Sequence, residues 1–244
     1  MSVREDVRAS FSHPRALRVC LFGVVGISLA MLVVWPQGTL AAAVHAGQAS
    51  ETFTVVCVCF LLVLLYLGAR FGSDDLSEDA GAKLHEYVRL TPASVARLVG
   101  ARFTAGAAHT ALLVLLGAPL LAASLSVGGA TPPQMLACLL VLGMAGMVAR
   151  MWGLLALSVA GTRRSPRGFI AYTGISASAL TTFYLAPSVS PFHVLAGLPR
   201  ATGVSAAWPC IAACAGAAVT LAAGSAGALA VRRVRARRHS RKGS

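Results

Sequence analysis

The chain has 244 residues, of which 57% are hydrophobic and only 12% are charged, and its formal net charge is +13. A soluble domain carries charge on about a quarter of its residues, so the composition argues against a soluble fold. The positive charge does not indicate nucleic-acid binding, because aromatic residues do not interleave the basic runs and no basic domain lies apart from the apolar stretches. We expect these charges to contact anionic membrane lipids instead.

Six long apolar stretches predict an all-α, polytopic membrane protein. A helix needs about 20 apolar residues to cross the hydrocarbon core of a bilayer. Stretches of that kind occur at about 16–35, 53–70, 103–127, 133–160, 168–186 and 207–231. The sequence therefore predicts six transmembrane helices in a single transmembrane domain over 1–244, which ends in a basic cytoplasmic tail over 232–244.

The first stretch has two interpretations. Basic residues, an apolar core and then Leu40-Ala41-Ala42-Ala43 resemble a cleaved secretory signal peptide. The apolar core is long for a signal peptide, and polar residues separate it from the alanines, which favours an uncleaved anchor. The other five spans keep the same orientation in either case.

The segment between the second and third spans, 71–102, predicts a short amphipathic helix. Ser77 is a good N-cap, and Glu78 and Asp79 follow it where acidic side chains complement the positive end of the helix dipole. Pro92 ends this helix near Leu90, because proline disfavours helical geometry at the preceding residue. We expect the helix to lie along the inner membrane surface. Its apolar face is formed by Ala80, Leu84, Tyr87 and Val88.

A second helix is expected to start at Thr91-Pro92, because threonine is a good N-cap and proline fits the first helical turn. This helix leads directly into the third span. The segment is therefore predicted to be a rigid elbow that could pass force from a cytoplasmic partner to the spans. The apolar stripe of the second helix is formed by Val95, Leu98, Val99 and Phe103.

His109 and Arg150 lie well inside predicted spans and are candidates for a translocation path. His109, in the third span, is interpreted as a neutral side chain that is hydrogen-bonded to a neighbouring helix. Arg150 lies in the fourth span, where a charge at the bilayer centre costs about 2.5–3.5 kcal/mol on insertion scales. It either snorkels toward the cytoplasmic side or faces a water-filled cavity that holds an anionic substrate or a lipid phosphate.

The last outer loop, 187–207, mixes prolines with apolar residues such as Phe192 and Leu195. Two interpretations remain open. The segment either dips back into the membrane as broken helices, which is tolerated where protein or water covers the backbone, or it forms an ordinary surface loop.

Lys and Arg are distributed unequally between the loops. Nineteen of the 21 fall in the alternate segments that share a side with the N-terminus, whereas Arg200 lies on the other side and Arg150 lies within a span. Lys and Arg are retained in the cytoplasm during membrane insertion. We therefore expect a multi-pass protein of the bacterial inner membrane with both termini in the cytoplasm.

The sequence lacks the motifs of several common enzyme classes. It contains no G-x-x-x-x-G-K-[ST] phosphate loop, no H-E-x-x-H and no G-x-S-x-G. The six cysteines lack the paired C-x-x-C arms of a zinc site, so we expect neither a metal nor a disulfide. We expect no enzymatic activity and no cofactor bound by the chain itself.

One family resemblance emerges from the inner loop. The stretch Glu86-Tyr87-Val88-Arg89-Leu90-Thr91-Pro92-Ala93-Ser94, followed by Leu98-Val99-Gly100-Ala101-Arg102, resembles the first cytoplasmic loop of type-2 ABC transporter permeases. One departure is that this family often carries an acidic-basic-acidic cluster with a Gly-Thr pair just upstream. Here Ser77-Glu78-Asp79-Ala80-Gly81-Ala82 contains neither Thr nor Arg.

The resemblance implies that residues 77–90 form a coupling helix, which docks on a separate ATP-binding ABC subunit. It also implies a homodimer or a heterodimer with another permease copy, and export driven by ATP on the partner subunit. The final outer loop would then resemble paired re-entrant helices. The residues that carry the coupling contact would be Leu84, Glu86, Tyr87, Arg89, Leu90, Thr91 and Pro92.

Two other functions stay open. One is a membrane scaffold or assembly protein that has no transport cycle. The other is a carrier driven by an ion gradient, although such carriers usually need an acidic residue inside a span, and none of the predicted spans contains one.

Overall fold

The computed structural model describes residues 14–35, 48–73, 94–126, 130–160, 164–201 and 204–242. These residues contain helices and no strand, which confirms the all-α prediction for the described part of the chain. The α-helices are α2 (Pro14–Val34), α4 (Gln48–Gly72), α6 (Val95–Ser126), α7 (Pro132–Ala160), α8 (Arg164–Leu185), α9 (Pro191–Gly197) and α10 (Trp208–Lys242). Three short 3-10 helices flank α9, namely η1 (Pro187–Val189), η2 (Leu198–Arg200) and η3 (Val204–Ala207).

Four helical segments in the described residues are long and apolar enough to cross a membrane. They overlap the second, third, fourth and sixth predicted spans and indicate a membrane protein. The first and fifth predicted spans are also helical, but α2 has a shorter apolar part, Cys20–Val34, and α8 is rich in Ser and Thr. The count of six spans therefore stays a prediction. The four segments are Glu51–Gly72, Val95–Ala123, Pro132–Ala160 and Val204–Val234.

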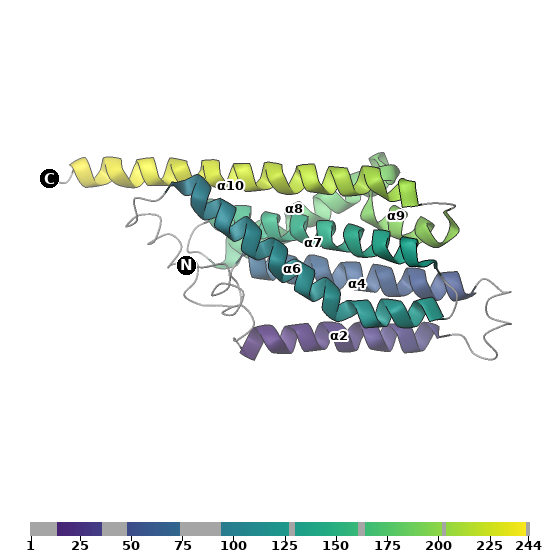
Figure 1. Ribbon diagram of the computed structural model, residues 1–244. Helices are drawn as coiled ribbons and strands as arrows, with labels where there is room; N and C mark the ends of the chain where they lie inside the picture. The colour runs from purple at the N-terminus through teal and green to yellow at the C-terminus, as the bar shows by residue number, and fades with distance from the viewer. Residues whose placement is uncertain are drawn as a thin grey trace.

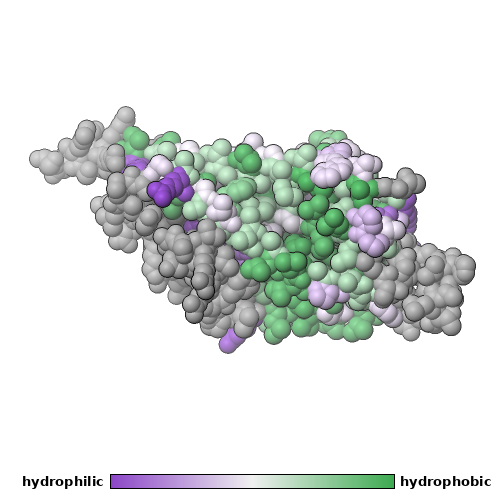
Figure 2. Space-filling view, in the orientation of Figure 1, coloured by the Kyte–Doolittle hydropathy of each residue, from purple (hydrophilic) through white to green (hydrophobic). Residues whose placement is uncertain are grey.

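The long helices run side by side in an elongated bundle (Figure 1). The first residues of α2 and the last residues of α10 lie at the same end of the bundle, which we call the α10 end. Apolar residues cover the middle of the face in Figure 2, and hydrophilic residues gather toward its two ends. An apolar band of this kind suits a bundle surrounded by lipid.

Helix α7 is the centre of the bundle. It packs against α4, α6, α8 and α10, and its buried residues extend from Gln134 to Ser158. A helix that is apolar on all sides is expected to be enclosed by other helices. Each face of α7 therefore contributes to a different part of the core.

Small residues bring α4 and α7 into close contact. A Cβ atom added at Gly68 of α4 would lie 2.8 Å from the carbonyl oxygen of Gly146 in α7. A Cβ atom added at Gly153 of α7 would lie 2.6 Å from the carbonyl oxygen of Ala69. Only glycine permits this approach, in the same way that small residues allow close packing of membrane helices in general.

The predicted stripe at the start of the third span packs as expected. Val99 is buried, and Val95, Leu98 and Phe103 pack against the same core cluster. The cluster is completed by residues of α7 and α10, among them Met151 and Leu229. The start of α6 is thereby fixed to both helices.

Residues 187–201 and 204–207 of the last predicted loop fold as short broken helices. Val194, Leu195 and Leu198 are buried, and α9 packs against α4 and α7. The side-chain amide of Gln134 in α7 donates hydrogen bonds to the carbonyl oxygens of Leu198 (2.9 Å) and Ala201 (3.0 Å). This segment closes the end of the bundle opposite the α10 end, which we call the α9 end (Figure 1).

Most of the basic tail predicted over 232–244 is helical. Helix α10 continues without interruption to Lys242. Arg, Ala and Lys are strong helix formers, so the end of the apolar stretch does not end the helix.

Candidate functional site

The structure brings together the two ionisable residues that the sequence placed inside spans. Arg150 of α7 is 8% exposed and His109 of α6 is fully buried. Nη1 of Arg150 contacts Nδ1 of His109. The guanidinium group has only donors, so Nδ1 accepts the hydrogen bond and the imidazole is the neutral tautomer with its proton on Nε2. His109 is thus bonded to a neighbouring helix, as the sequence interpretation expects.

Residues of three helices enclose this pair. The ring of Phe71 in α4 meets the His109 ring edge-on at a centroid distance of 4.2 Å, and Cζ of Arg150 lies 6.0 Å from the centroid of Phe71. Gly106 of α6 leaves the room that the arginine occupies, because a Cβ atom there would lie 2.9 Å from Nε of Arg150. The pair is therefore packed between α4, α6 and α7.

The burial of Arg150 does not favour the snorkelling interpretation. A snorkelling side chain keeps its charged group in water, whereas Arg150 is buried and bonded to another helix. The cavity described next is not lined by Arg150 or His109 either. The two residues form an interhelical polar contact, and their place in a translocation path stays a prediction.

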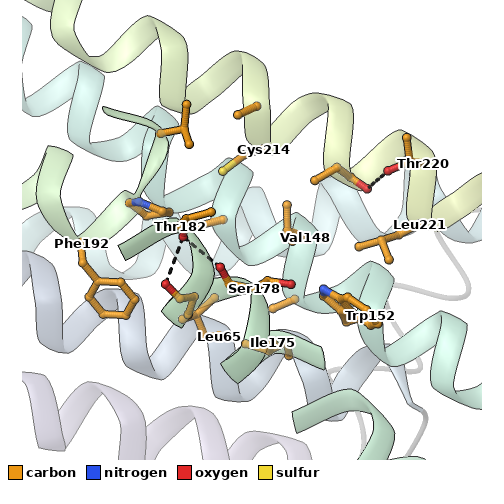
Figure 3. A pocket seen from close by; sticks show the side chains of 17 residues that line it. Leu65, Val148, Trp152, Ile175, Ser178, Thr182, Phe192, Cys214, Thr220 and Leu221 are labelled. Atoms are coloured by element: carbon orange, nitrogen blue, oxygen red, sulfur yellow. Dashed lines mark hydrogen bonds between the residues drawn. The ribbon is translucent and has the colours of Figure 1, made fainter. Parts of the chain in front are cut away.

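A cavity of about 270 Å³ lies on the other side of α7. Its walls come from α7, α8 and α10, with Leu65 of α4 at its floor and Pro191 and Phe192 of α9 at one end. Figure 3 shows Phe192 and Trp152 at opposite ends of the row of lining side chains. The volume is just under the range of about 300–1,000 Å³ typical of small-molecule sites.

The wall of the cavity is apolar despite its hydroxyl groups. The hydroxyl of Ser178 donates to the carbonyl oxygen of Gly174 (2.8 Å), and that of Thr182 donates to Ser178 (3.0 Å). The hydroxyl of Thr220 donates to Ala217 (2.9 Å). Each donor is thus used within its own helix. The cavity offers a ligand an apolar surface with few available donors.

The cavity is partly open along the side of the bundle. Helices α8 and α10 both pack extensively against α7, but they share little direct contact with each other. Side chains of α8 and α10 line opposite walls, and Ala213 and Thr220 of α10 are exposed at the rim. The opening therefore lies between two helices of the bundle rather than at its end.

Two arginines of the unequal charge distribution, Arg167 and Arg232, donate hydrogen bonds to backbone carbonyl oxygens of other segments. Arg167 of α8 is buried and donates to the carbonyl oxygen of Ser73, just beyond α4. Arg232 of α10 donates to the carbonyl oxygen of Val159, near the last residue of α7. Cations at helix C-termini satisfy free carbonyls and complement the negative end of the dipole. These side chains link neighbouring helices at the α10 end of the bundle.

The cysteines also form a contact that the sequence did not reveal. All six are free thiols. Sγ of Cys57 in α4 and Sγ of Cys138 in α7 lie 3.1 Å apart. The contact is buried, so these thiols serve as small packing groups between the two helices.

The predicted coupling helix 77–90 lies outside the described residues. This applies to all seven residues assigned to the ATPase contact, namely Leu84, Glu86, Tyr87, Arg89, Leu90, Thr91 and Pro92. The description resumes at Ser94, whose hydroxyl accepts a hydrogen bond from the backbone N–H of Arg97 (3.3 Å). Ser94 is in this way the N-cap of α6.

The cavity was not predicted from the sequence, because its lining comes from six helical segments and each contributes only ordinary apolar or hydroxyl residues. One sequence feature does mark a wall of the cavity, namely the Ser- and Thr-rich composition of α8. When the chain was compared with known proteins, no family model, no curated protein and no solved structure matched it.

Proposed function

We propose that this chain is the membrane-spanning permease subunit of an ATP-driven exporter of the type-2 ABC class. The observation that carries the proposal is the continuity of α6. The helix runs unbroken from Val95, next to the predicted coupling segment, to Ser126. At 1.5 Å per residue it is about 48 Å long, which exceeds the hydrocarbon core of about 30 Å.

A helix of this kind can act as a lever. The start of α6 is held against α7 and α10 by the cluster around Val99, Met151 and Leu229. A force applied just before Val95 would therefore move α7 and α10 together with α6. Both helices also form walls of the apolar cavity, so the same movement would change the shape of that cavity.

The motor in this proposal is a separate chain. The sequence has no phosphate loop, so ATP would be bound by an ABC subunit that docks on residues 77–90. Two permease copies, identical or not, would complete the transporter in the bacterial inner membrane, with both termini in the cytoplasm. The basic residues at the α10 end would contact anionic lipids.

The test is co-purification with a phosphate-loop ATPase encoded beside this chain. The wild-type chain should retain the ATPase in mild detergent. A triple variant, Lys83→Glu with Tyr87→Ala and Arg89→Glu, should lose it while still inserting into the membrane. A matched control, Arg237→Glu with Arg238→Glu, should retain the ATPase, because these arginines lie in the basic tail, far in the sequence from residues 77–90. ATPase binding that survives the triple change would overturn the coupling assignment.

A scaffold protein would give a different result. It would insert and assemble normally, but it would not stimulate ATP hydrolysis by any partner. A carrier driven by an ion gradient would transport in vesicles that contain neither ATP nor a second subunit.

A further inference from the structure

We propose that the cavity between α7, α8 and α10 holds one acyl chain of a membrane phospholipid. The proposal concerns a binding site and does not depend on the proposed transport function. It rests on the polarity, position and shape of the cavity, together with its lateral opening.

Water is a poor occupant of this cavity. A buried water molecule needs two to four polar partners. The hydroxyl donors of Ser178, Thr182 and Thr220 are already bonded to carbonyl oxygens of their own helices. Most of the remaining lining is aliphatic or aromatic, and includes Leu65, Val148, Ile175 and Leu221. The wall matches hydrocarbon better than water.

The position of the cavity favours a lipid chain. Its lining on α10 runs from Ala213 to Leu221 and its lining on α7 runs from Ala145 to Trp152. Both stretches belong to helices that are long and apolar enough to cross a membrane. The lateral gap between α8 and α10 would therefore face acyl chains, and the lipid would come from the leaflet on the α9 side.

The length of the cavity suits part of one acyl chain. Eight residues of α10 separate its ends, which corresponds to about 12 Å along the helix. An extended hydrocarbon chain can lie along a groove of this length. A helix of a second copy is the competing occupant, and the dilution experiment below distinguishes it from lipid.

Trp152 provides a direct reporter, because it lines the cavity beside Leu221 (Figure 3). The chain has three tryptophans, so Trp35→Phe with Trp208→Phe leaves Trp152 as the only one. The full-length variant is reconstituted in phosphatidylcholine vesicles, with or without bromine in the middle of one acyl chain. Bromine quenches indole fluorescence on contact. We expect brominated lipid to quench Trp152 strongly.

Cavity-filling variants separate a chain in the cavity from lipid that only surrounds the bundle. Ala217→Leu, on the α10 wall, should cut the quenching of Trp152 by about half, because the larger side chain occupies the space of the acyl chain. Ala179→Leu fills the cavity from the α8 wall and gives an independent check. The matched control is Ala223→Leu, on an exposed part of α10 outside the cavity, which should leave quenching unchanged.

Three results would overturn the proposal. The first is an absence of quenching by brominated lipid. The second is equal quenching in both cavity-filling variants and in the control. The third is quenching that grows when the protein is diluted in lipid, since this would mean that a second copy normally covers the cavity. No ATPase is present in this assay, so its failure and the failure of the transport proposal are distinguishable.

Discussion

Arg150 of α7 and His109 of α6 are 41 residues apart in the sequence and are joined side chain to side chain in the core of the bundle. The guanidinium group is held away from the surface, with Phe71 beside it and Gly106 opposite. This contact makes Arg150, the only strongly charged residue well inside a predicted span, a link between two helices. Its removal has testable consequences for stability.

The first prediction concerns that link. His109→Leu should lower the free energy of unfolding in micelles by about 1.5–3 kcal/mol, because the buried guanidinium loses its acceptor. The double change His109→Leu with Arg150→Met should be less destabilising than the sum of the two single changes, since neither partner is then left buried alone. A double-mutant cycle measures this coupling, and strictly additive effects would argue against the contact.

The second prediction concerns the close approach of α4 and α7. Gly68→Ala should destabilise the protein by about 1–3 kcal/mol, because the added methyl group overlaps the backbone of α7. Gly100→Ala is the matched control, since a Cβ atom there meets nothing within 4 Å. The control should be neutral or slightly stabilising, because alanine favours helix more than glycine does. Thermal unfolding in detergent gives both values, and similar effects at the two positions would contradict the packing.

The third prediction concerns the broken helices at the α9 end. Gln134→Glu keeps an acceptor for Thr131 but removes the amide donor that binds the carbonyl oxygens of Leu198 and Ala201. Amide hydrogen exchange over 194–201 should become faster, by an amount that corresponds to about 1–3 kcal/mol. Met135→Leu, a volume-conserving change at the next position, should leave the exchange unaltered. Unchanged exchange in Gln134→Glu would show that the amide does not anchor the segment.

The fourth prediction concerns the start of α6. Ser94→Ala should destabilise the first turn of the helix by about 1 kcal/mol, because the N–H of Arg97 loses its acceptor. Ser94→Asp should restore the cap, since an aspartate oxygen accepts the same hydrogen bond. Amide exchange at Arg97 is the measurement. If the alanine and aspartate variants exchange equally fast, Ser94 is not the cap.

The parts of the fold that the sequence predicts well are those set by local composition. The length of the apolar stretches alone locates the four long apolar helices. Helical spacing alone finds the apolar stripe at the start of α6, in which Val99 is buried. Helix α10 continues past the predicted end of the sixth span at 231, because arginine and lysine favour helix. Whether α8 crosses the membrane is harder to predict from hydropathy. Its hydroxyl groups donate hydrogen bonds to carbonyl oxygens of their own helix, which lowers the free-energy cost of placing them in lipid.

The site is less predictable because it depends on contacts between distant segments. The sequence around His109 does not predict its contact with Arg150. Likewise, the sequence around Trp152 does not predict that Phe192 lines the other end of the same cavity. Spacing did carry one overlooked signal. Gly68 and Gly72 lie four residues apart within an apolar stretch, a pattern typical of closely packed membrane helices.

The most direct test of the transport proposal is the rate of ATP hydrolysis by the partner subunit when both chains share a vesicle membrane. The decisive comparison is wild type with Ala101→Pro, which breaks α6 between the coupling segment and the span. Ala101→Leu is the control, because leucine keeps the helix. We predict that the ATPase binds all three chains and that only the proline variant fails to stimulate hydrolysis. Full stimulation by the proline variant would contradict the role of α6 as a lever.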